Sequence, residues 1–215
     1  MFTKKEILPI ILIIFAFAFG LFIYPLLPEQ IPSHWNIEGE IDSWSGKGFA
    51  VLFFPSLTLI FYLLMTFIPL IDPLRKNYLK FSRAYFWFRF LFVAFMISLY
   101  LYTLGAAFGN QIKINYFIIP ALAVLFIFLG LFMPKVKRNY FVGIRTPWTI
   151  HSEETWNETH KYAGRVFIIA GLISLVGLFL PEYSFLIFII AVMCAMIISV
   201  VYSYFVFRRM GGFKK

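Results

Sequence analysis

Residues 28–48 form a polar segment that places one histidine near several carboxylates. His34 precedes Glu38 by four positions and Asp42 by eight. These side chains could coordinate a metal ion, but zinc sites in proteins use three or four protein ligands and this segment has a single histidine. We therefore predict no metal site here.

A second polar segment, residues 134–165, carries four further candidates for metal binding or general-base catalysis. They are His151, Glu154, Glu158 and His160. Their spacing differs from the His-Glu-x-x-His pattern, in which two histidines hold zinc and the glutamate acts as the base. The sequence also shows no nucleophile with an adjacent base. We therefore expect these residues to cap or solvate a helix, and we predict no catalytic residue, no metal and no other cofactor.

Ser152 is placed to begin that helix. Its hydroxyl can accept a hydrogen bond from the first turn, where Glu153 and Glu154 interact favourably with the helix dipole. Trp156 and His160 then share one helix face because they are four positions apart. We expect Trp156 to be an anchor at the membrane interface.

Most of the remaining sequence is too apolar for a water-soluble domain. Hydrophobic residues make up 61% of the 215 residues and charged residues only 13%, about half the usual charged share. A helix needs about 20 apolar residues to cross a bilayer. The predicted fold class is therefore an all-α integral membrane protein with about six transmembrane helices, at 7–27, 49–71, 84–108, 116–133, 166–180 (with a start near 163) and 185–207.

The distribution of charge predicts the orientation of these helices. With both termini in the cytoplasm, the inner segments hold seventeen basic and five acidic residues, net +12, and the outer segments hold two basic and five acidic, net −3. Basic residues concentrate on the cytoplasmic side of membrane proteins. We therefore predict a multi-pass protein of the bacterial cell membrane, with segment 28–48 extracellular and segment 134–165 cytoplasmic. Anionic lipid accounts for the basic inner segments, so we expect no direct nucleic-acid binding.

Arg89 is the one ionisable residue inside the predicted spans. Two interpretations are open: its long side chain reaches the interface, or it pairs with a buried partner such as Asp72. A proton- or sodium-coupled transporter needs buried carboxylates near the middle of the membrane. The predicted spans contain none, which disfavours coupled transport.

The extracellular segment is rich in proline, glycine and asparagine, which favour turns over a regular element. Two interpretations of it are open. In one, Trp35 and Trp44 are interfacial anchors and the acids keep the loop in water. In the other, the segment folds as a cap that presents a recognition surface.

Both polar segments resemble a known family. The inner one reads Pro134-Lys135-x-Lys137-Arg138-Asn139-Tyr140-Phe141-Val142-Gly143-Ile144-Arg145-Thr146-Pro147-Trp148-Thr149, followed by Ser152-Glu153-x-x-Trp156-x-x-Thr159-His160. This resembles the signature of the SdpI family of bacterial membrane proteins. The outer one, Leu27-Pro28-x-x-Ile31-Pro32-x-His34-Trp35-Asn36 with Gly39, Asp42 and Lys47, resembles the domain of unknown function that often precedes it.

The resemblance implies an immunity protein that protects a producing bacterium from a secreted peptide toxin and signals by holding a transcriptional repressor at the membrane. The expected partners are membrane lipids, the toxin outside and the repressor inside. The resemblance implies toxin-binding residues at His34, Trp35, Asn36, Gly39, Asp42 and Lys47. It implies a cytoplasmic signature at Lys137, Arg138, Asn139, Gly143, Arg145, Thr146, Pro147, Trp148, Ser152, Glu153, Trp156 and His160.

We expect two domains, residues 1–71 with the outer segment and residues 72–215 with the inner one. A receptor-like binding protein without enzymatic activity is the favoured class. A membrane-embedded enzyme acting on lipid or peptide would need Arg145, Glu154 and His160 to converge near one headgroup. An uncoupled transporter or flippase is the other alternative, although the sequence has no ATP-binding motif and no clear inverted repeat.

Overall fold

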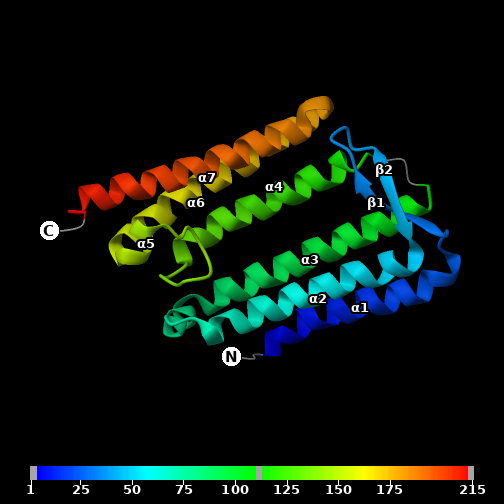
Figure 1. Ribbon diagram of the computed structural model, residues 1–215, viewed down its shortest axis with the longest axis horizontal. Helices are drawn as coiled ribbons and strands as arrows, with labels where there is room; N and C mark the ends of the chain where they lie inside the picture. The colour runs from blue at the N-terminus through cyan, green and yellow to red at the C-terminus, as the bar shows by residue number, and fades with distance from the viewer. Residues whose placement is uncertain (1–3, 110–112, 213–215) are drawn as a thin grey trace.

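Six long helices form the body of the protein, which confirms the predicted fold class (Figure 1). The computed structural model describes residues 4–109 and 113–212. Each of the six is long and apolar enough to cross a membrane, so the chain is a multi-pass membrane protein. The helices are α1 (Ile7–Ile23), α2 (Lys47–Ile71), α3 (Ser82–Ala107), α4 (Asn115–Phe132), α6 (Glu153–Val176) and α7 (Ser184–Arg209), and a short helix, α5 (Pro147–His151), precedes α6.

The helices pack as two neighbouring groups of three (Figure 1). Helices α1, α2 and α3 share a core in which Ile13, Val51 and Val93 are buried. Helices α4, α6 and α7 share another, which includes Ala163 and Ala195. In this packing, α3 belongs with α1 and α2. The predicted domain boundary at residue 71, which falls between α2 and α3, stays a prediction.

Glycines bring the backbones of α4 and α6 into direct contact. A Cβ atom on Gly164 would lie 2.6 Å from the carbonyl oxygen of Gly130, and one on Gly130 would clash with the carbonyl oxygen of Gly164. Small residues at a helix crossing allow this close approach, which strengthens packing where lipid removes the hydrophobic driving force. Helix α6 therefore packs closely against α4.

The outer segment folds as a β-hairpin, so the prediction of turns without a regular element is wrong there. Strands β1 (Gln30–Trp35) and β2 (Ile41–Gly46) pair antiparallel, with Gln30 opposite Gly46 and Trp35 opposite Ile41. Asn36 and Gly39 form the connection, where Gly39 has a φ of 81°, while Pro32 and Gly46 lie within the strands. The flanking β-branched and aromatic residues suit a strand, and Ile31 is fully buried in the core of the first helix group.

The fifth membrane helix begins well before its predicted start. Helix α6 starts at Glu153, whereas the apolar stretch alone pointed to residues 163–166. Ser152 caps it by accepting a 3.2 Å hydrogen bond from the backbone N–H of Thr155, as the sequence predicts. In the first turns of α6 the charged residues Glu153, Glu154 and Lys161 are exposed, while the buried face packs against the preceding loop.

Candidate functional site

The described termini and the loop between α4 and α6 lie at one end of the helix bundle, and the hairpin lies at the other (Figure 1). At the hairpin end, two exposed polar side chains from the two strands form a pair. The Nδ1 atom of His34 lies 2.6 Å from a carboxylate oxygen of Asp42, and the two side chains are 67% and 42% exposed. These are the two predicted toxin-binding residues that the structure brings together at the surface.

The other four predicted residues of this segment position the hairpin. Trp35 packs against the ring of Tyr102 in α3, with ring centroids 6.1 Å apart. The side chain of Asn36 accepts a hydrogen bond from the backbone N–H of Glu40 at 2.8 Å, and the carbonyl of Gly39 accepts one from Ile114 at the start of α4. Lys47 forms a 2.8 Å ion pair with Glu29 and lies over the ring of Tyr24.

Two exposed apolar side chains complete this surface and were not among the predicted site residues. Trp44 in β2 and Ile37 in the turn are each 52% exposed. Trp44 lies opposite Pro32 in the strand register. We call His34, Ile37, Asp42 and Trp44 the hairpin surface. A tryptophan among the polar residues of segment 28–48 was the sequence signal for it.

At the opposite end, residues 134–152 form a compact fold that we call the signature loop. Asn139 organises it and is fully buried. Its side-chain oxygen accepts hydrogen bonds from the backbone N–H groups of Phe141 and Val142, and its amide nitrogen donates to the carbonyls of Lys137 and Val142. The side chain thus replaces the regular backbone pairing that a loop lacks.

A second buried group, Asp72 after α2, ties this loop to the first helix group. Its carboxylate accepts hydrogen bonds from the backbone N–H of Tyr140 at 2.9 Å and from the hydroxyl of Tyr78 at 3.1 Å. The same hydroxyl lies 3.1 Å from the side-chain oxygen of Asn139. Asp72 therefore anchors the signature loop through hydrogen bonds and does not pair with Arg89.

Trp156 and His160 hold the loop against α6, and the expectation that Trp156 is an interfacial anchor is wrong. Trp156 is fully buried, its indole N–H donates to the carbonyl of Val136 at 2.8 Å, and its ring stacks on that of His160. The His160 ring lies between the Trp156 carbonyl and the Ile144 N–H. Because a carbonyl only accepts and an N–H only donates, His160 is protonated on Nδ1 and accepts through Nε2.

Gly143 must be glycine for this contact to form. Its φ is 113°, a region that other residues rarely adopt, and a Cβ atom there would clash with Nε2 of His160. Both nitrogens of His160 are used by backbone groups, so neither is free to act as a base toward a substrate. Among the described residues, no group of three or more potential metal ligands is present.

Most of the remaining signature residues also fold the loop. Arg138 donates to the carbonyls at the end of α5, and Arg145 donates to the carbonyl of Tyr140. Thr146 and Thr149 form a capping box at the start of α5, with Pro147 in its first turn. Trp148 packs edge-on against Tyr204 of α7. Lys137 is half-buried and Glu153 is exposed in the first turn of α6.

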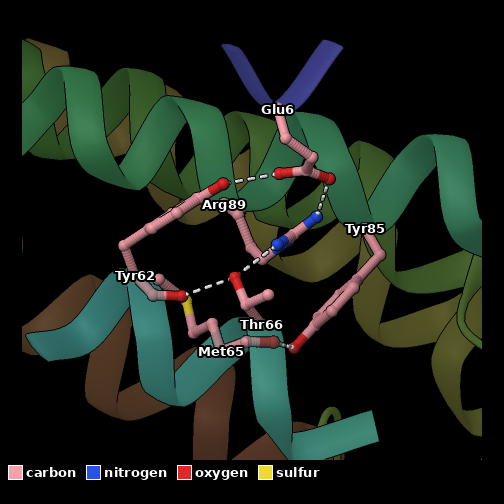
Figure 2. A network of polar contacts seen from close by, with 6 residues as sticks. All are labelled: Glu6, Tyr62, Met65, Thr66, Tyr85 and Arg89. Atoms are coloured by element: carbon pink, nitrogen blue, oxygen red, sulfur yellow. Dashed lines mark hydrogen bonds and ion pairs between the residues drawn. The ribbon is translucent and has the colours of Figure 1, made fainter. Parts of the chain in front are cut away.

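Figure 2 shows a buried polar network that was not predicted, around Glu6 at the start of α1. The guanidinium of Arg89 forms a 2.5 Å ion pair with Glu6, and each side chain is 8% exposed. Arg89 also donates to the hydroxyl of Thr66, and the hydroxyl of Tyr62 donates to Glu6. Of the two interpretations for Arg89, burial with a partner is correct, but the partner is Glu6.

These features define a class: a six-helix membrane protein with a β-hairpin at one end and a side-chain-folded loop at the other. Residues 135–203 match the SdpI/YfhL protein family, and residues 11–59 match a Domain of unknown function (DUF1648). These matches confirm the resemblance that the motifs predict: part of the chain, residues 135–203, is similar to the SdpI/YfhL family.

One relative matches almost end to end. The chain is 29% identical over 212 residues to the protein named "Immunity protein SdpI" of Bacillus subtilis (strain 168), and the match covers 97% of this chain and 99% of that protein. No solved structure matches the chain.

Proposed function

We propose that this chain is a membrane immunity protein that neutralises a secreted antimicrobial peptide toxin. The observation that carries the proposal is the 29% identity to immunity protein SdpI along nearly the full length of both chains. The match covers 97% of this chain and so includes the hairpin, the signature loop and all six long helices.

The proposed orientation places the hairpin outside the cell and the signature loop in the cytoplasm. It rests on the seventeen basic residues that the inner segments then hold, against two in the outer segments, since cytoplasmic segments carry the excess of lysine and arginine. A toxin arriving from outside would meet the hairpin first.

The proposed toxin contact is the hairpin surface. His34 and Asp42 offer a hydrogen-bonding pair at the tip of two strands, and Trp44 and Ile37 offer apolar area. A membrane-active peptide has both polar and apolar faces, and exposed tryptophan is a frequent centre of binding energy at protein interfaces. Trp35, Asn36, Gly39 and Lys47 would act by holding the hairpin in place.

A second role, recruitment of a cytoplasmic partner such as a transcriptional repressor, is proposed for the signature loop. Its inward side chains are used in folding, whereas Tyr140 and Phe141 are exposed at its surface. Exposed aromatic residues on a rigid loop suit protein binding. The hydrogen bonds that occupy His160 favour such a binding role over catalysis.

The test is survival of a Bacillus subtilis strain that lacks its own SdpI and is exposed to a titrated preparation of the secreted toxin that kills it. Expression of this chain should raise the lethal toxin concentration at least tenfold relative to an empty vector. Equal killing, with membrane insertion of the chain verified, would contradict the proposal. Degradation of the toxin by membranes that contain the chain would favour the enzymatic alternative instead.

A further inference from the structure

A cavity of about 190 Å³ opens where α1 and α3 begin, beside the buried polar network. Its lining combines the cationic side chains of Lys5, Arg83 and Arg89 with the apolar side chains of Leu79 and Phe86. Glu6 is the one carboxylate among its lining residues, and Arg89 and Tyr62 already bind both of its oxygens. The cavity is therefore positively charged.

The cations of this cavity have unused binding capacity. Within residues 4–109 and 113–212, Lys5 and Arg83 form no ion pair, and both are exposed at the cavity mouth. Deeper in, the Nε–H of Arg89 is buried and has no hydrogen-bond partner among the described atoms. A buried donor without a partner costs about 1–3 kcal/mol, so a ligand that accepts from it would stabilise the protein.

We propose that this cavity binds the headgroup of an anionic phospholipid. The phosphate would lie at the mouth between Lys5 and Arg83, an ester carbonyl would accept from Nε of Arg89, and the start of an acyl chain would lie along Leu79 and Phe86. Basic residues at a membrane surface attract anionic lipid, and this site lies at the start of two membrane helices. The site is independent of toxin binding at the other end of the bundle.

The apolar lining is what favours a lipid over a soluble anion. A free phosphate would satisfy Lys5 and Arg83 but would leave Leu79 in water, where it is 70% exposed. A phospholipid supplies an anion, a neutral acceptor and a hydrocarbon chain, and the lining offers cations, a buried N–H donor and apolar side chains.

The test is native mass spectrometry of the delipidated full-length protein in neutral detergent, titrated with phosphatidylglycerol or phosphatidylcholine. Phosphatidylglycerol should bind at least tenfold more tightly. Because each basic residue near a headgroup contributes about fivefold in affinity, the double variant Lys5→Ala/Arg83→Ala should lose about 25-fold for phosphatidylglycerol. Arg89→Lys keeps a cation beside Glu6 but lacks Nε, and it should weaken binding of both lipids.

The matched control is Arg209→Ala, which removes an exposed arginine at the end of α7 and should change affinity less than twofold. Equal affinity for the two lipids, or an equal loss in Arg209→Ala and in the double variant, would overturn the proposal. A second arm measures thermal stability with millimolar inorganic phosphate and no lipid. If phosphate alone stabilises the wild type but not the double variant, the ligand is a soluble anion and the lipid assignment is wrong.

Discussion

The two ends of the molecule use their motif residues in opposite ways. At the signature-loop end, Asn139, Trp156 and His160 are buried and bond to backbone groups. At the hairpin end, His34 and Asp42 are exposed and bond to each other. A family motif thus specifies a folded scaffold at one end and an accessible surface at the other, so substitutions should separate stability from function.

The largest stability effect is expected at the buried ion pair. Glu6→Gln leaves the Arg89 charge without its partner and should lower the free energy of unfolding by about 3–5 kcal/mol. The double variant Glu6→Gln/Arg89→Met should recover much of this loss, because no charge then remains buried. Unfolding in detergent micelles measures both, and a single variant within about 1 kcal/mol of wild type would show that the pair is not buried.

Asparagines at the two ends provide a direct contrast. Asn139→Leu removes four hydrogen bonds to the backbone of the signature loop and should cost about 3 kcal/mol. Asn36→Ala removes one exposed bond in the hairpin turn and should cost about 0.5–1 kcal/mol. Equal losses, measured by the same unfolding assay, would remove the distinction between scaffold and surface.

Trp156 and Trp44 allow the same comparison of buried and exposed side chains, with a smaller expected difference in stability. Trp156→Phe leaves the buried carbonyl of Val136 without its donor and should cost about 1–3 kcal/mol. Trp44→Phe changes an exposed ring and should stay within about 0.5 kcal/mol of wild type. Intrinsic fluorescence during unfolding measures both variants. A larger loss of unfolding free energy in Trp44→Phe than in Trp156→Phe would contradict the assignment of Trp156 as the structural tryptophan.

The smallest stability effect is expected for the cross-strand pair of the hairpin. His34→Ala and Asp42→Ala should each change the free energy of unfolding by less than about 0.5 kcal/mol, because exposed pairs contribute little. Circular dichroism of the purified variants during heating measures this. A loss as large as that of Asn139→Leu would mean that the pair holds the hairpin together.

The sequence predicted the helices well because each is a long apolar run, and it predicted the Ser152 cap because capping is a local interaction. It failed where the structure depends on distant segments. Glu6 and Arg89 are 83 positions apart, so only the packing of α1 against α3 reveals their contact. Trp156 looked like an interfacial anchor because the loop that covers it has no periodic pattern.

The hairpin was missed for a different reason. Residues 28–48 hold five prolines and glycines, which favour turns, yet only Gly39 lies in the connection. Pro32 and Gly46 lie within the two six-residue strands, which still pair. Composition averages over a segment, whereas pairing depends on where each residue lies.

The most direct test of this account is the protection assay on hairpin variants that insert normally. The double variant His34→Ala/Asp42→Ala should abolish protection of the sensitive Bacillus subtilis strain at wild-type membrane levels. The matched control Ser33→Ala/Ser43→Ala removes the neighbouring exposed cross-strand contact and should protect as the wild type does. Full protection by the His34/Asp42 variant would contradict the claim that the hairpin surface meets the toxin.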